Sequence, residues 1–161
     1  MKSICLVGTD GHGKTTLIQQ LVGKLVSKGL RVGTIKHSGH EHELDKPGKD
    51  SYKHRTAGAR PAGIITKSMA GVYWQLGEGQ NAFETMEPLY VDCDIVLVEG
   101  FKTGPYRKVE VFRVAAGGTP LAASDDTIEA VISDDNPDVD VPVWPRSDLD
   151  KLADEIMELV R

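Results

Sequence analysis

The chain has 161 residues, a length typical of one domain with room for a sizeable buried core. Hydrophobic residues make up 40% of it and charged residues 27%, as in ordinary globular proteins, and the formal net charge is −5. This negative balance argues against non-specific binding to nucleic acid or to an anionic membrane surface. The first apolar run, residues 4–7, is too short for a secretory signal or a membrane span, so we expect a cytoplasmic protein.

Residues 8–16 read Gly-Thr-Asp-Gly-His-Gly-Lys-Thr-Thr and match the phosphate-binding loop pattern G-x-x-x-x-G-K-[ST]. The strand-like run 4–7 precedes the loop, and apolar residues spaced three and four apart predict a helix over 15–28. This strand–loop–helix order is the context that the pattern requires. Backbone N–H groups of such a turn bind anions, and the positive end of the helix points to the same place. The residues predicted to bind the phosphates of a nucleoside triphosphate are Thr9, Asp10, Gly11, His12, Gly13, Lys14, Thr15 and Thr16.

Two side chains of this loop have specific expected roles. Lys14 supplies a cation at the β- and γ-phosphates, and the hydroxyl of Thr15 is the expected Mg²⁺ ligand. The alternative is a glycine-rich turn that only joins a strand to a helix.

A second strand is predicted over residues 31–36, and the short link after Gly29 implies a right-handed parallel crossover. The polar, histidine-rich stretch 37–48 has no periodicity and is predicted to be a loop. It leaves the carboxyl end of the strand, which is the edge where open parallel sheets bind ligands. A short helix is expected over about 50–59.

Two apolar runs, 62–66 and 71–76, are separated by a short link and predict a pair of antiparallel strands. Such a pair would make the sheet mixed. We interpret it as a β-hairpin insertion around 62–76 in a single nucleotide-binding domain of residues 1–161. A short helix is expected over 81–89.

Residues 94–100, Asp-Ile-Val-Leu-Val-Glu-Gly, predict a central parallel strand that is buried on both faces. The strand ends in Glu99 and Gly100 at the ligand edge. Glu99 is interpreted as a carboxylate that organises Mg²⁺ or water beside the triphosphate. A solvated acid at a strand end is the alternative.

The basic turn 102–108 precedes an alternating strand over 109–114, and its cations either face anionic ligand groups or lie in solvent. Another strand is predicted over 127–132. Ser133 and Asp134 follow it, and they either accept hydrogen bonds from a guanine edge or form a turn.

The chain closes with a short edge strand predicted over 139–143 and an amphipathic helix over 149–160. Ser147 and Asp150 resemble a capping box in front of that helix. Together these elements predict an α/β fold of the P-loop NTPase type, a three-layer α/β/α arrangement with a mostly parallel, mixed sheet.

Several segments together carry a likeness to a known family, namely residues 8–16, 35–37 with Asp45, 47–51, 57–59 and 98–102. They resemble the molybdopterin-guanine dinucleotide biosynthesis protein B (MobB) family. The likeness extends over nearly the whole chain, and the Lys-His pair with the Pro-Gly-Lys-Asp-Ser block is far more discriminating than the phosphate loop.

The resemblance implies a GTP-binding homodimer with weak GTPase activity and with GTP and Mg²⁺ as cofactors. It implies that the protein assists a molybdopterin guanylyltransferase, which attaches GMP to molybdopterin, so the implied partners are that enzyme and molybdopterin or its guanine dinucleotide. Carried over by position, the catalytic set is Lys14, Asp45 and Glu99, the metal set is Thr15, Asp45 and Glu99, and Lys36, His37 and Gly100 join the nucleotide site. Guanine preference rests on the family, because the chain has no Asn-Lys-x-Asp motif.

Three functions stay open: a slow Mg²⁺-dependent GTPase, a nucleotide-dependent adaptor, and a metallochaperone. The first two are compatible, and we favour a slow GTPase that acts as an adaptor. A metallochaperone would use His37, His40 and His42 with neighbouring carboxylates to bind Zn²⁺ or Ni²⁺. The histidine spacing matches no closed zinc pattern, and no cysteine joins it. A small-molecule kinase is the weakest rival, since the chain has no arginine-rich lid segment.

Overall fold

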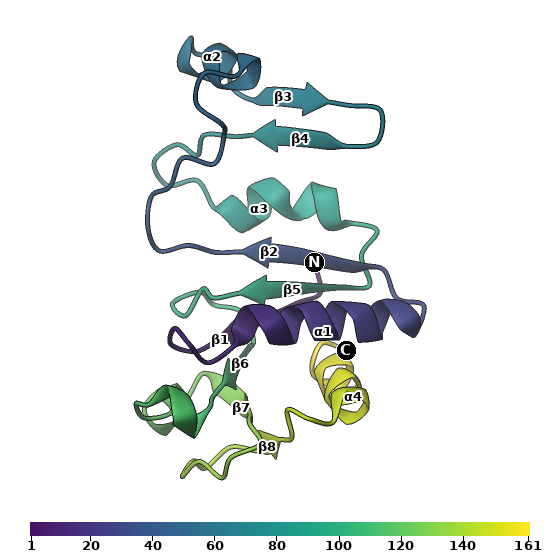
Figure 1. Cartoon of the computed structure of the whole chain (residues 1–161), viewed down its shortest axis with the longest axis vertical. Coiled ribbons are helices and arrows are strands. Elements are labelled where there is room, and N and C mark those ends of the chain that lie inside the picture. Colours follow the sequence, from purple (N-terminus) through teal and green to yellow (C-terminus); the bar gives the residue numbers. More distant parts are fainter. The chain divides into compact units, whose positions relative to one another are not determined.

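The computed structural model describes all 161 residues, which form two compact units, residues 1–39 with 89–161 and residues 40–88. The first unit contains a six-stranded sheet in the order β2-β5-β1-β6-β7-β8 (Figure 1). Its strands are β1 (Ser3–Val7), β2 (Val32–Lys36), β5 (Ile95–Glu99), β6 (Lys108–Val111), β7 (Ile128–Ile132) and β8 (Val143–Trp144). All neighbouring pairs are parallel, so the carboxyl ends of the strands share one edge.

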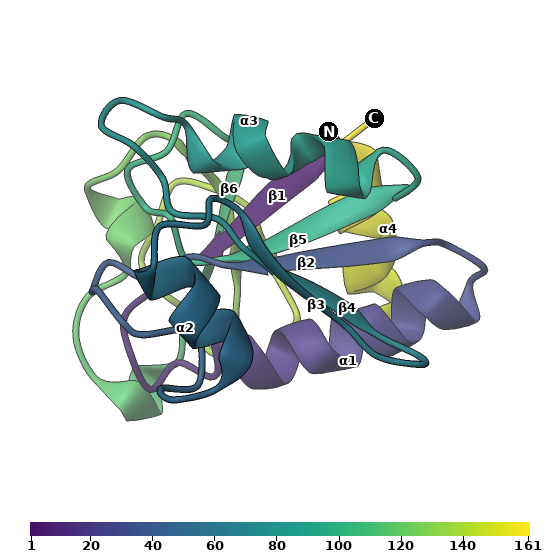
Figure 2. The same ribbon diagram turned by 90° about the horizontal axis from the view of Figure 1, so that it is seen from above.

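The strand β5 lies between β2 and β1, and each of its five residues is buried. This confirms the central strand predicted from the Ile-Val-Leu-Val run. Seen from above, β1, β5 and β2 fan out with the twist expected of a parallel sheet (Figure 2).

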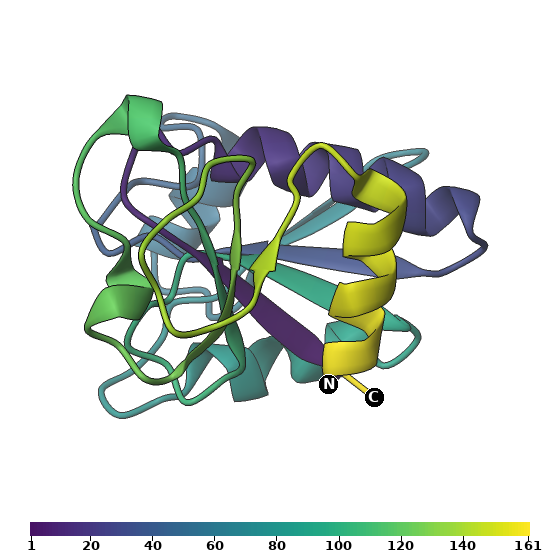
Figure 3. The same ribbon diagram turned by 90° about the horizontal axis from the view of Figure 1, so that it is seen from below.

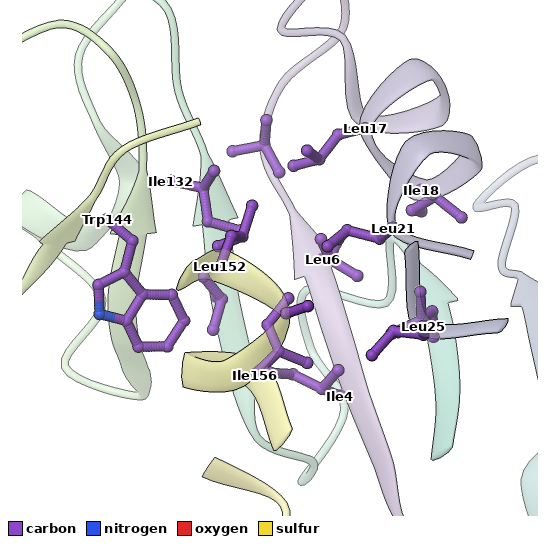
Figure 4. Packing of buried hydrophobic residues seen from close by; sticks show 14 of the residues in the cluster. Ile4, Leu6, Leu17, Ile18, Leu21, Leu25, Ile132, Trp144, Leu152 and Ile156 are labelled. Atoms are coloured by element: carbon purple, nitrogen blue, oxygen red, sulfur yellow. The ribbon is translucent and has the colours of Figure 1, made fainter. Parts of the chain in front are cut away.

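Two helices, α1 (Lys14–Ser27) and α4 (Leu149–Leu159), pack against each other and cover one face of this sheet (Figure 3). The apolar stripe of α1 points inward because its residues recur at helical spacing. Figure 4 shows how these side chains meet the strands: Leu17, Ile18, Leu21 and Leu25 from α1, Leu152 and Ile156 from α4, and Ile4, Leu6, Ile132 and Trp144 from the sheet.

The opposite face carries the 3-10 helix η3 (Leu121–Ala123), while η2 (Val114–Ala116) follows β6. In the 3-10 helix η1 (Glu87–Tyr90), the ring of Tyr90 lies against Gly33 of β2. Val109 and Val111 belong to the core under α1 and α4, so Glu110 between them points to the other face. There its carboxylate accepts hydrogen bonds from the backbone N–H groups of Leu121 at 2.8 Å and Ala122 at 2.9 Å. Helical segments therefore lie on both faces, as expected for the predicted α/β class.

The second unit contains α2 (Asp50–Thr56), the strands β3 (Ala62–Ile65) and β4 (Ala70–Tyr73), and α3 (Ala82–Met86). The predicted antiparallel pair is present as β3 and β4. These strands pair only with each other in a separate two-stranded sheet, so the prediction that they would make the main sheet mixed is wrong. A single functional domain over 1–161 stays a prediction.

Three local predictions near the carboxyl end differ from the structure. The edge strand is β8, which pairs with β7, and the residues of 139–142 are not in a strand. The cap of α4 is Asp148, whose side chain accepts a hydrogen bond from the N–H of Lys151 at 3.0 Å, so Ser147 is not the cap. Lys108 is a buried residue of β6, with its ammonium donating to the Thr127 hydroxyl at 2.8 Å, and is not a cation of the basic turn. None of the helices combines the length and the apolar composition that crossing a bilayer requires.

Candidate nucleotide-binding site

The phosphate-loop pattern connects β1 to α1 at the carboxyl edge of the parallel sheet. α1 begins at Lys14, directly after Gly13, whose φ of 79° is left-handed. Gly8 has a φ of 142°, and a Cβ there would come within 2.6 Å of the carbonyl oxygen of Val111. Both fixed glycines of the pattern are therefore required by the backbone itself.

The side chain of Lys14 folds back over the loop. Its ammonium donates hydrogen bonds to the carbonyl oxygens of Gly8 at 3.0 Å and Thr9 at 2.7 Å. Burial lowers the pKa of Lys14, while the neighbouring Asp10 and Glu99 carboxylates oppose that shift. The loop thus combines a helix N-terminus with one cation, which is the arrangement that binds phosphate. Of the other predicted residues, Thr9, Asp10, Gly11 and Thr16 are exposed to solvent.

Glu99 ends β5 next to this loop, and it is only 8% exposed, which excludes the alternative of a solvated acid. Its carboxylate accepts a hydrogen bond from the Thr15 hydroxyl at 2.8 Å and forms an ion pair with Lys36, its partner in the strand register. Burial raises the pKa of Glu99, but hydrogen bonds from Lys36 and Thr15 outweigh burial, and the pKa lies below its ordinary value. Glu99 is therefore ionised at neutral pH.

Oxygen ligands are what Mg²⁺ prefers, and the residues present fit that ion. The Thr15 hydroxyl and one oxygen of Glu99 are already within hydrogen-bond distance of each other. Asp45, in the second unit, is 4% exposed, and its Oδ1 accepts hydrogen bonds from the Ser51 hydroxyl at 3.0 Å and from the N–H of Lys46 at 2.8 Å. Its Oδ2 is buried without a hydrogen-bond partner. A buried carboxylate oxygen in this state is suited to a cation.

The segment after Glu99 is held by backbone bonds. The N–H of Gly100 donates to the carbonyl of Leu6 at 2.9 Å, so this donor is engaged in the sheet and not directed to a phosphate. The N–H of His37 donates to the carbonyl of Glu99 at 3.0 Å. The imidazole ring of His37 lies 4.4 Å from the ring of Phe101. Phe101 itself has a φ of 65°, an uncommon conformation for a residue with a side chain.

His12 is buried under the loop, with 2% of its surface exposed. Its Nδ1 accepts a hydrogen bond from the N–H of Arg113 at 2.9 Å, and its ring stacks 5.2 Å from that of Phe112. Burial lowers the pKa of His12, against an opposing effect of Glu110, so the imidazole is neutral at pH 7. The side chain supports the loop, and the backbone of His12 is the part left for a phosphate.

At the end of β7, Ser133 and Asp134 differ in role. Ser133 is buried, and its hydroxyl accepts a hydrogen bond from the N–H of Asp135 at 3.0 Å, which is turn chemistry. Asp134 is exposed, and its Oδ1 accepts hydrogen bonds from the N–H and the hydroxyl of Ser147, both at 2.8 Å. Those bonds lower the pKa of Asp134, so it carries a fixed negative charge.

Sequence reasoning missed Arg146, which lies against the phosphate loop. Its guanidinium donates to the carbonyl oxygens of Gly13 at 3.0 Å and His12 at 3.5 Å. No motif contains it, and only its position as a basic residue just before the last predicted helix pointed to the ligand edge.

The histidines predicted as alternative metal ligands are divided between the units, with His37 in the first and His40 and His42 in the second. The rings of His40 and His42 lie 6.2 Å apart, but no group of three His, Cys, Asp or Glu side chains is placed to hold a metal ion. The structure therefore offers the metallochaperone alternative no cluster of ligands.

A parallel sheet with this loop between its β1 strand and α1 defines a protein of the P-loop NTPase fold. A sequence model of the family described as "MobB: Molybdopterin guanine dinucleotide synthesis protein B" matches residues 3–134. The chain belongs to this family.

Known proteins agree with that assignment. The molybdopterin-guanine dinucleotide biosynthesis adapter protein of Escherichia coli is 35% identical over 153 residues, which is 92% of this chain and 87% of that protein. The protein of the same name from Haemophilus influenzae is 30% identical over 161 residues, 94% of this chain and 85% of that protein. A crystal structure of molybdopterin-guanine biosynthesis protein B superposes with a TM-score of 0.74 at 26% identity and covers 99% of each chain.

Proposed function

We propose that this protein is a GTP-binding adaptor with slow, Mg²⁺-dependent GTPase activity in molybdopterin guanine dinucleotide biosynthesis, where it assists a guanylyltransferase partner. Its relatives in Escherichia coli and Haemophilus influenzae are named adapter proteins of this biosynthesis. The observation that carries the nucleotide part is the contact of Thr15 with Glu99 beside the phosphate loop. Two free cysteines, Cys5 and Cys93, suit a reducing cytoplasm.

The chemistry of GTP hydrolysis needs positioning and charge neutralisation more than it needs a strong base. The loop N–H groups and Lys14 would orient the phosphates, and Lys36 adds a second cation at the same edge. Bound Mg²⁺ would supply neutralisation of the developing negative charge. The residues of the first unit that would hold it are Thr15 and Glu99. Asp45, in the second unit, stays a predicted ligand that rests on the resemblance to the family.

Glu99 is set up as a cation ligand and not as a general base. Its carboxylate already accepts hydrogen bonds from Thr15 and Lys36, and its pKa is lowered. A weak hydrolytic activity suits an adaptor whose conformation depends on whether GTP or GDP is bound. The loop 37–48 would order on the γ-phosphate, as switch segments do.

The homodimer in this proposal is supported by the hairpin of the second unit. An isolated two-stranded hairpin is marginally stable in water. β3, β4 and the residues around them nevertheless expose large apolar side chains, namely Ile64, Ile65, Met69, Val72, Trp74 and Leu76. A second copy of the chain would cover this surface.

The test is GTP turnover by the wild-type protein and by Lys14→Ala, with Mg²⁺ and with Mg²⁺ chelated. We expect slow, Mg²⁺-dependent turnover in the wild type and a loss of about a hundredfold or more in the variant, the cost of removing one preorganised charge-stabilising group. Equal rates in the two proteins would exclude a GTPase site at this loop.

The adaptor part has its own test, limited proteolysis of the loop 37–48. We expect slower cleavage with a non-hydrolysable GTP analogue than with GDP. Equal cleavage in the two states would exclude a nucleotide-dependent switch in this loop.

A further inference from the structure

Arg146 joins the last strand of the sheet to the phosphate loop. Trp144, at the end of β8, is anchored in the hydrophobic core, and Arg146 follows two residues later. Its guanidinium donates to the carbonyl of Gly13 at 3.0 Å, and a Cβ on Gly13 would come within 3.1 Å of a guanidinium nitrogen. The planar group therefore lies directly against the start of α1, where the loop turns into the helix.

Ser147, the residue after Arg146, connects Asp134 to the same region. Ser147 donates two hydrogen bonds to Asp134 Oδ1, one from its N–H and one from its hydroxyl, each 2.8 Å long. Arg146 and Asp134 thus belong to one structure that is built from the carboxyl ends of β7 and β8 and is attached to the phosphate loop. Asp134 is exposed and ionised, so its carboxylate has acceptor capacity beyond the two bonds from Ser147.

These two groups suit a guanine base. A guanidinium plane stacks on the face of any nucleobase. A carboxylate accepts hydrogen bonds from two adjacent donors, and the N1–H and 2-amino groups of guanine are such a pair, whereas adenine has an acceptor at N1. A nucleotide with its phosphates in the loop carries its base one ribose away from them, and the guanidinium of Arg146 is hydrogen-bonded to this loop at the carbonyl of Gly13.

We propose that the guanidinium of Arg146 stacks on the base of the bound nucleotide. Ser147 is a positioning residue, which holds the Asp134 carboxylate in place to accept hydrogen bonds from guanine. This deepens the proposed function and rests on it. Arg146 confers affinity for any base, and Asp134 confers the choice of guanine.

The first experiment separates the base from the phosphates by calorimetric titration with GTP and with inorganic tripolyphosphate. In Arg146→Ala we expect the affinity for GTP to fall about tenfold, as for loss of one base stack, while the affinity for tripolyphosphate changes less than about twofold. Lys151→Ala is the matched control, because it removes one exposed positive charge of α4 in the same unit. Equal losses for both ligands would show that Arg146 only stiffens the loop, and would overturn the stacking assignment.

The second experiment tests the reading of guanine with Asp134→Asn, in which the amide oxygen still accepts from Ser147. We expect this variant to prefer xanthosine triphosphate, whose 2-oxo group accepts from the new amide, and Ser147→Ala to lose most of the preference for GTP over ATP. Retention of the wild-type preference for GTP in Asp134→Asn would overturn the assignment. A wild-type protein that binds no nucleotide would overturn the proposed function itself, whereas binding that none of the three variants changes would overturn this inference alone.

Discussion

The two compact units of the chain use their apolar residues in opposite ways. In the first unit, the large aliphatic side chains of α1, α4 and the sheet form one buried cluster, many of them fully inaccessible. In residues 40–88, Ala62 and Phe83 are the buried hydrophobic residues, while Ile65 is 84% and Met69 is 74% exposed. The first unit has its own core and carries the candidate nucleotide site, whereas the second unit exposes an apolar surface that is suited to contact.

The largest effect that would test this contrast is a change in stability. Leu21 is fully buried in the core, so Leu21→Ala should lower the free energy of unfolding by about 3 kcal/mol, through lost burial and the cavity left behind. Ile65→Ala, on the exposed hairpin, should change it by less than about 0.5 kcal/mol when measured on the monomer. Urea unfolding of both variants measures this. Similar losses in the two would mean that the hairpin is part of a core, and would break the contrast.

The next effect concerns association. If a second copy covers the hairpin, Trp74→Asp should weaken dimerisation at least about tenfold, because a charge replaces a large aromatic contact. Val26→Asp is the matched control, since Val26 is equally exposed, at 53% against 52% for Trp74, but lies in the first unit. Sedimentation over a range of concentrations measures the dissociation constant. A dimer that Val26→Asp disrupts and Trp74→Asp leaves intact would place the interface elsewhere.

A third effect asks whether the second unit also contributes chemistry. Asp45→Asn should raise the Mg²⁺ concentration needed for half-maximal GTP turnover by about tenfold, because a neutral amide oxygen is a weaker ligand for a hard cation. Asp50→Asn, an exposed acid of the same unit, is the control. Unchanged Mg²⁺ dependence in Asp45→Asn would leave the metal to Thr15 and Glu99 of the first unit.

The smallest effect is a pH dependence within the first unit. The pKa of folded Glu99 lies below its ordinary value of 4.5, so its ionised form stabilises the fold above that value. This contribution is lost as the pH falls through the lowered folded pKa. The stability advantage of the wild type over Glu99→Gln should therefore be constant from pH 7 to about 5 and should shrink below 4.5. Urea unfolding across this range tests the sign, and an advantage that grows on acidification would contradict it.

The parts of the fold that were predictable are those encoded by local patterns. The phosphate loop was recognisable because its glycines adopt backbone conformations that depend only on a few neighbouring residues. The strand β5 was recognisable because a strand that is buried on both faces is continuously apolar. The apolar stripes of α1 and α4 were predictable for the same reason, since helical spacing is a local pattern. By contrast, β8 has only two residues and is a strand because it pairs with β7. Two residues are too few for an alternating apolar pattern to mark its bounds.

The elements that carry the candidate site were predictable to the same extent and for the same reason. Lys14, Thr15 and Glu99 lie within or at the end of locally recognisable elements, and the structure brings Thr15 and Glu99 together. Arg146 belongs to no pattern, and Ser147 was assigned only to a capping box that the structure does not form. They reach Gly13 and Asp134 from 133 and 13 residues away, through the parallel pairing of β7 and β8.

By itself, the sequence determined that this protein has a phosphate loop, a central buried strand with an acid at its end, and membership of the MobB family. Those are properties of short segments, in which backbone conformation and hydrophobic period are dictated by neighbouring residues. Only the tertiary structure decided that Glu99 is buried and paired with Lys36 and Thr15, that the hairpin forms a sheet of its own, and that Arg146 lies on the phosphate loop. Burial, strand partners and long-range hydrogen bonds depend on which distant segments meet, and that is set by packing of the whole unit.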